Sequence, residues 1–268
     1  MTQNEPEVLS EHLELDVAPQ VKWGTGVVLG PNCREVRIGF GCFVGNDIYI
    51  DVERLTLGDY VTIHHGGVVH GKRCAIGHNC WIGHYTILDS LGGRLAIGNN
   101  VGIGAHSQIW SHMKFGDVLA GCRWQSHGET ILEDDVWLVG HCVVAPIRAA
   151  ERSMLMVGGV AVRDMAANRV YAGTPAKDVT ERMGPQFRDE VPYEERAAVF
   201  AAYLEEFAAQ GHDVSFVRYA PQLPAESADR HTWFGLQSRT YRPRYTDDEH
   251  RLMKFLLYDR AKFVPQRP

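Results

Sequence analysis

An aliphatic residue recurs at every sixth position over nearly half of the chain. Between residues 38 and 162 these positions form six groups of three, and sixteen of the eighteen are Ile, Leu or Val. An amphipathic helix would need spacings of three and four residues, and the glycines that follow many of these positions would interrupt it. The repeat therefore predicts short strands joined by turns. The positions are Ile38, Val44, Ile50, Leu57, Ile63, Val69, Ile76, Ile82, Leu88, Ile97, Ile103, Ile109, Leu132, Leu138, Val144, Ala150, Met156 and Val162.

Extra residues between these hexads occur only after every third one. The longest insertion precedes Leu132, which lies twenty-three positions after Ile109, seventeen more than one hexad requires. Three hexads with a tolerated insertion at one corner describe a triangular coil whose aliphatic side chains point inward. Successive coils would pair as parallel strands about 4.8 Å apart. We therefore predict an all-β solenoid, a parallel β-helix of about six 18-residue coils.

The repeat divides the chain into three parts. We expect residues 1–20 to form an N-terminal tail or cap, and residues 21–182 to form the β-helix with a long loop at 110–131. Residues 183–268 lack the glycine rhythm and are expected to form a small C-terminal α+β appendage. Within it, an apolar helical face between Tyr193 and Gln210 and a capping box from Thr246 to Glu249 predict two helices.

Charge and composition exclude several classes of function. The formal net charge of -6 offers nothing that would attract nucleic acid or an anionic membrane. No apolar run approaches the roughly eighteen residues that a membrane span needs, and the first twenty residues lack the pattern of a signal peptide. The six cysteines contain no C-x-x-C pair and are expected to be free thiols. We expect a cytoplasmic protein without nucleic-acid or membrane partners.

The I-G-x-x-x-x hexads between residues 38 and 167 resemble those of the hexapeptide-repeat acyltransferases, among them the sugar and antibiotic acetyltransferases. This resemblance implies a left-handed winding, acetyl-CoA as cosubstrate and no required metal. It also implies a homotrimer with active sites between adjacent subunits. The expected acceptor is a small molecule, either a sugar or a nucleotide-sugar of cell-surface polysaccharide synthesis, acylated on a hydroxyl or an amine.

Three further segments carry the resemblance. Ser111-His112-Met113 occupies the place of the family's catalytic histidine, at the start of the long loop. The segment around Trp137 resembles the one that reopens the prism, which implies that this tryptophan lies beside the coenzyme A arm, although Val139 stands where glycine is usual. The exit ending at Lys177 resembles the family's A-G-x-P-A-K turn near the coenzyme A phosphates. The candidates for coenzyme A binding are Trp137, Gly140, Gly158, Gly159, Arg163 and Lys177.

The chemistry of acyl transfer favours a histidine as general base. The acceptor must lose a proton as it attacks the thioester, and an imidazole with a pKa of about 6.5 can take that proton at neutral pH. His112 is the first candidate for this role and His127 the second, while Glu129 is a candidate to orient a histidine. The candidates for acceptor binding are Trp110, Trp124, His84 and His106.

A histidine-rich stretch leaves two alternatives open. His65 and His70 resemble a pair of zinc ligands in the γ-class carbonic anhydrases, which share the prism. A third histidine should precede them by about two coils, but residues 25–35 contain none. We therefore expect no metal site. A zinc-dependent protein like the γ-class carbonic anhydrases and a non-catalytic β-helix scaffold are the alternatives to the transferase.

Overall fold

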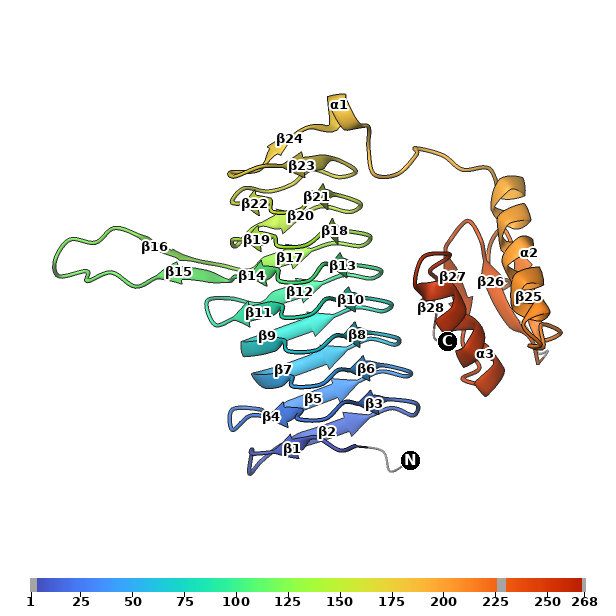
Figure 1. The fold of residues 1–268 in the computed structure, drawn as a ribbon, viewed down its shortest axis with the longest axis horizontal. Coiled ribbons are helices and arrows are strands. Elements are labelled where there is room, and N and C mark those ends of the chain that lie inside the picture. The colour runs from blue at the N-terminus through green and yellow to red at the C-terminus, as the bar shows by residue number, and fades with distance from the viewer. Residues whose placement is uncertain (1–3, 226–229, 267–268) are drawn as a thin grey trace. The chain divides into compact units, whose positions relative to one another are not determined.

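The computed structural model describes residues 4–225 and 230–266, which divide after Phe187 into two compact units. The first unit is a solenoid of short parallel strands (Figure 1). One face is a nine-stranded sheet with the order β24-β23-β21-β18-β13-β10-β8-β6-β3. Its strands are β3 (Lys22–Trp23), β6 (Phe43–Val44), β8 (Thr62–Ile63), β10 (Trp81–Ile82), β13 (Gly102–Ile103), β18 (Trp137–Leu138), β21 (Met154–Leu155), β23 (Val170–Ala172) and β24 (Lys177–Asp178).

The other two faces belong to one sheet of thirteen strands. Two long strands, β7 (Tyr49–Leu57) and β9 (Val68–Ile76), cross the corner between these faces and join them. The remaining strands are β1 (Glu7–Val8), β2 (Glu14–Val17), β4 (Val28–Leu29), β5 (Glu35–Ile38), β11 (Ile87–Ser90), β12 (Leu95–Ile97), β14 (Gln108–Ile109), β17 (Thr130–Leu132), β19 (Val143–Val144), β20 (Arg148–Ala149) and β22 (Val160–Ala161).

The solenoid has more than the six coils that we predicted. Eight of the strands in the nine-stranded sheet, β3 to β23, are parallel and come from successive coils. The additional coils lie outside the regular repeat. At the N-terminal end, Trp23 and Leu29 keep the six-residue spacing but Trp23 is not aliphatic. Strands β1 and β2, within the segment expected to be a tail or cap, pair in parallel with β4 and β5.

The core contains the repeat positions of the first five groups, all fifteen of which are buried. In the last group the prediction is wrong by one residue. Ala149, Leu155 and Ala161 are buried and lie in register with Leu132, Leu138 and Val144, whereas Val162 is 47% exposed. The reason is a corner containing Pro146, where only five positions separate Val144 from Ala149.

A β-hairpin interrupts the solenoid where the sequence predicted a long loop. Strands β15 (His112–Lys114) and β16 (Gln125–His127) pair in antiparallel fashion, and the hairpin projects from the side of the solenoid (Figure 1). A short helix, α1 (Thr180–Met183), follows β24 at the end of the first unit.

The second unit packs two helices and a four-stranded sheet. The helices are α2 (Tyr193–Ala209) and α3 (Asp247–Leu257), and the sheet has the order β25 (Val217–Ala220), β26 (Thr232–Gly235), β27 (Thr240–Arg242) and β28 (Val264–Pro265). Thr246 caps α3 by accepting the Glu249 N–H. The buried Glu249 carboxylate accepts N–H groups of Arg244 and Tyr245 rather than the N–H of Thr246 itself. Among the described residues, no helix is long and apolar enough to cross a membrane.

Candidate functional site

His112 lies at the base of the hairpin, at the corner where the chain leaves the thirteen-stranded sheet after β14. The side chain is 22% exposed, and its Nδ1 lies 2.9 Å from Oδ2 of Asp89. An ionised carboxylate can only accept hydrogen bonds, so Nδ1 of a neutral His112 carries the proton. Its Nε2 is then unprotonated and can accept a proton from a substrate.

Asp89 is held in place by a set of hydrogen bonds. It is the third residue of β11 and is completely buried. Its Oδ2 accepts the Ser111 N–H at 2.9 Å and the Ser111 hydroxyl at 2.5 Å, and its Oδ1 accepts the Leu91 N–H at 3.2 Å. Burial alone would raise the pKa of Asp89, but the hydrogen bonds from Ser111, His112 and Leu91 outweigh it and lower that pKa. The carboxylate is therefore ionised at neutral pH.

A second histidine approaches the other oxygen of this carboxylate. His70 is paired with Asp89 across β9 and β11, and its Nε2 lies 3.4 Å from Asp89 Oδ1. The structure thus places His70 beside the carboxylate that orients the candidate base.

The sequence predicted His112 as a candidate base but did not predict the carboxylate that contacts it. Glu129, the expected orienting residue, is exposed, and its Oε2 lies 3.4 Å from Arg94. Asp89 was missed because it is 23 residues away and belongs to the preceding coil. The available signal was its position: Asp89 follows the repeat residue Leu88, which pairs with Ile109 just before Ser111 and His112.

Of the other candidates on the hairpin side, His127 and Trp110 lie beside His112 and Trp124 lies further out. His127 is directly opposite His112 in the β15–β16 ladder and is exposed. The Trp110 ring meets the His112 ring edge-on at a centroid distance of 6.2 Å, and its indole N–H donates to Gln108. Trp124 lies on the hairpin and is 84% exposed.

His84 and His106 lie at a different corner. This corner is between the nine-stranded sheet and the face of the thirteen-stranded sheet that contains β11, β14 and β19. There they belong to a row of aromatic rings that runs along the solenoid. The Tyr85 and His106 rings stack at 5.1 Å, and the His106 and His141 rings stack at 4.9 Å. We call this edge of the solenoid the histidine corner. It begins with His64 and His65, whose rings lie 4.6 Å and 5.2 Å from that of His84.

The histidine corner continues into a column of glycines. The Gly158 N–H donates to the Gly140 carbonyl at 3.0 Å, and the Gly173 carbonyl accepts the Val160 N–H. Gly140 and Gly158 have φ values of 147° and 70°, which residues with a Cβ rarely adopt. No atom lies within 4 Å of the position that a Cβ on Gly158 would take. A ligand can therefore approach the backbone closely here.

Most of the other candidates for coenzyme A binding lie around this column. Trp137 is on β18 in the nine-stranded sheet and is 45% exposed, and Gly159 follows Gly158 directly. Lys177 lies on β24, where it pairs with Ala172 of β23. Arg163 is exposed and follows β22. The structure thus brings these candidates, apart from Arg163, to one side of the solenoid and places His112 at the corner opposite the nine-stranded sheet. Arg163 lies two residues after Ala161, which aligns through Val144 with Ile109, so it shares the corner of Ser111 and His112.

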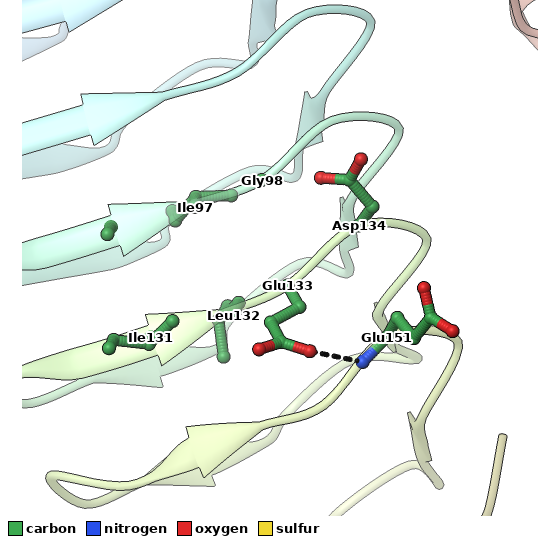
Figure 2. Close-up of a pocket in the computed structure, with 8 residues that line it drawn as sticks. Ile97, Gly98, Ile131, Leu132, Glu133, Asp134 and Glu151 are labelled. Atoms are coloured by element: carbon green, nitrogen blue, oxygen red, sulfur yellow. Dashed lines mark hydrogen bonds between the residues drawn. The ribbon is translucent and has the colours of Figure 1, made fainter. Parts of the chain in front are cut away.

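A shallow groove of about 400 Å³ lies on another part of the surface (Figure 2). It is lined by Ala96 and Ile131 and by the carboxylates of Glu133, Asp134 and Glu151. Glu133 accepts the Glu151 N–H at 2.9 Å and contacts Arg148. The acidic rim would repel the phosphates of coenzyme A, and the groove contains none of the candidate residues.

Comparison with solved structures places the solenoid among known folds. The polysialic acid O-acetyltransferase OatWY matches with a TM-score of 0.55 and 18% identity, over 72% of this chain and 97% of that chain. This likeness confirms the predicted left-handed parallel β-helix. Lower TM-scores relate the chain to NeuO, a polySia specific acetyltransferase (0.39; 16% identity; 73% and 100% of the two chains), and to the hexapeptide-repeat acetyltransferase VCA0836 of Vibrio cholerae O1 biovar eltor (0.37; 20%; 53% and 68%). No protein-family model and no curated sequence matches the chain.

Proposed function

We propose that the protein is a coenzyme A-dependent acyltransferase, with acetyl-CoA as donor and a small acceptor, and that His112 is its general base. The observation that carries this proposal is the His112–Asp89 pair at the base of the hairpin, with Nδ1 held by a buried, ionised carboxylate. OatWY, whose fold the chain shares, is described as a polysialic acid O-acetyltransferase. A sugar or nucleotide-sugar is therefore the acceptor class that we propose.

The proposed reaction needs one proton transfer at His112. Nε2 takes the proton from the acceptor hydroxyl or amine while the acceptor oxygen or nitrogen attacks the thioester carbonyl. The C–S bond then breaks, and the coenzyme A sulfur leaves as a thiolate that takes up the proton from the imidazolium. Asp89 keeps the imidazole in the required tautomer and stabilises its positive charge between the two transfers. A positioned general base of this kind contributes about 10²- to 10⁴-fold to the rate.

We propose that coenzyme A binds along the glycine column, with Trp137 and Gly140 beside the pantetheine arm and Gly158 and Gly159 allowing it close to the backbone. Lys177, an exposed cation near the end of this column, and Arg163, an exposed cation at the corner that holds Ser111, are the proposed contacts of its phosphates. The proposed contacts of the acceptor are His84 and His106 at the histidine corner, Trp110 beside His112, and Trp124 on the hairpin.

This arrangement requires two subunits. His112 lies at the corner opposite the nine-stranded sheet, whereas Trp137 faces outward from that sheet, so one chain cannot bring them together. We therefore propose a homotrimer in which the hairpin of one subunit meets the coenzyme A side of the next. The hairpin carries apolar side chains that need such cover, since Phe115 and Leu119 are fully exposed and Trp124 nearly so. We also propose a cytoplasmic location, in keeping with six free cysteines.

The test is an acyl-transfer assay with acetyl-CoA and a panel of sugars and nucleotide-sugars. His112→Gln and Asp89→Asn should each reduce turnover by about 10²-fold or more, because the base or its orienting carboxylate is lost. Coenzyme A affinity, followed by thermal shift, should remain within about twofold, since neither residue lies on the glycine column. His127→Gln is the matched control and should keep most activity. Full activity of His112→Gln would exclude the assignment.

A further inference from the structure

Three imidazoles converge at the start of the histidine corner. His64 and His65 follow β8, and His84 follows β10 on the next coil. One nitrogen from each ring lies within 4.8 Å of the others. The ring centroids are 4.6 Å apart for His64 and His84, 5.2 Å for His65 and His84, and 6.0 Å for His64 and His65. Small side-chain rotations would bring these nitrogens around one centre.

The backbone beneath these histidines is fixed by hydrogen bonds between coils. The His64 N–H donates to the Ile82 carbonyl at 2.8 Å, and the His65 carbonyl accepts the Tyr85 N–H at 2.9 Å. Neighbouring rings restrict His64 further, because its ring centroid lies 4.8 Å from that of Trp81 and 6.2 Å from that of Phe43. The donors are therefore held near one another before any ligand arrives, which lowers the cost of binding.

We propose that His64, His84 and His65 bind a divalent transition-metal cation such as Zn²⁺ or Ni²⁺. Imidazole nitrogen is a preferred ligand of these ions, while Mg²⁺ and Ca²⁺ prefer oxygen, which this group of residues does not supply. All three side chains are half-buried, so a fourth coordination position remains open to water. The site is separate from the corner that holds His112 and goes beyond the proposed acyl transfer.

The three histidines are not equivalent. His65 Nδ1 accepts the Asn46 N–H at 2.7 Å, which in a neutral ring leaves the proton on Nε2. Binding a metal through His65 thus requires the loss of that proton or of the hydrogen bond. No such hydrogen bond occupies the rings of His64 and His84 in the described part of the chain. We therefore assign His64 and His84 as the two strong ligands and His65 as the weak one.

The sequence of the neighbouring coil supplies a replacement that preserves the fold. Asn46 occupies the position of His65 one coil earlier, and its Oδ1 accepts the Thr25 N–H at 3.0 Å. Asparagine at position 65 can accept the Asn46 N–H in the same way, so His65→Asn removes the imidazole but keeps the corner. His106→Gln is the control for a histidine in the same row outside the group.

The experiment is isothermal titration of the purified, chelator-treated full chain with ZnCl₂ and NiCl₂, with MgCl₂ as the control ion. We expect one Zn²⁺ or Ni²⁺ per chain and no Mg²⁺ binding. His64→Gln and His84→Gln should each weaken binding on the order of 10- to 100-fold, His65→Asn by about threefold or less, and His106→Gln not at all. Melting of each metal-free variant confirms that it is folded.

Two results would overturn the site. One is a wild-type protein that binds Zn²⁺ no better than Mg²⁺, and the other is equal Zn²⁺ affinity in wild type and a folded His64→Gln, His84→Gln double variant. A loss in His65→Asn as large as in His84→Gln would overturn the assignment of His65 as the weak ligand. Zn²⁺ affinity is measured without acyl transfer, so the outcome for this site does not depend on the proposed function, in which His84 and His106 are acceptor contacts.

Discussion

Asp89 is the residue on which the candidate site depends most. Its two oxygens accept hydrogen bonds from a hydroxyl, an imidazole and two backbone N–H groups, all at the corner where the hairpin begins. Such a carboxylate is stabilised in its charged form despite being buried. Its lowered pKa therefore links the stability of the fold to pH.

We expect this link to appear at acid pH. The folded Asp89 has a pKa below its ordinary value of 3.8, so between these two values the unfolded chain binds more protons than the folded one. The stabilisation by Asp89 is fully present above about pH 5 and is lost as the pH falls through the folded pKa, at no more than about 1.4 kcal/mol per pH unit.

The measurement compares the free energy of unfolding of wild type and Asp89→Asn in urea. Between about pH 5 and pH 3 the difference between them should shrink, because asparagine has no proton to gain. His70 and His112, which face Asp89, are the same in both proteins. A difference that stays constant to pH 3 would contradict the lowered pKa.

At the scale of the strands, the sequence predicted most of the solenoid correctly because one constraint repeats. Each coil needs an aliphatic side chain at the centre of each face, so a six-residue grid located fifteen buried positions. The prediction failed where a corner changes length. The coil after Val144 is one residue short at Pro146, and no local signal distinguishes a five-residue corner from a six-residue one. Asp89 was missed for a different reason: the grid aligns Leu88 with Ile109 correctly, but it does not show which side chains meet at the corner that follows.

The shifted register can be tested with a pair of substitutions in the last coil. Leu155→Ala removes a completely buried side chain and should lower the free energy of unfolding by about 2–5 kcal/mol. Val162→Ala removes an exposed side chain that the original grid placed in the core, and should change it by about 0.5 kcal/mol or less. Urea denaturation of both variants checks the assignment, and the reverse order of effects would restore the original grid.

At the scale of the whole molecule, the proposed site is divided between two surfaces of each solenoid. The proposed general base is on the hairpin corner, and the coenzyme A candidates other than Arg163 are on the nine-stranded sheet and the glycine column. In the proposed homotrimer, cyclic symmetry would place the first surface of one subunit against the second surface of the next. Three chains of 30.0 kDa should therefore sediment together at about 90 kDa.

Mixed trimers provide the sharper test of the divided site. His112→Gln removes the base, and Trp137→Glu places a negative charge on the proposed coenzyme A surface at an exposed position, so each variant alone should be nearly inactive. When equal amounts are unfolded and refolded together, a given site combines the intact His112 of one subunit with the intact Trp137 of its neighbour in about one case in four. Activity should therefore recover to about a quarter of the wild-type value. If both variants are folded and trimeric but their mixture stays inactive, the base and the coenzyme act within one chain or His112 is not the base.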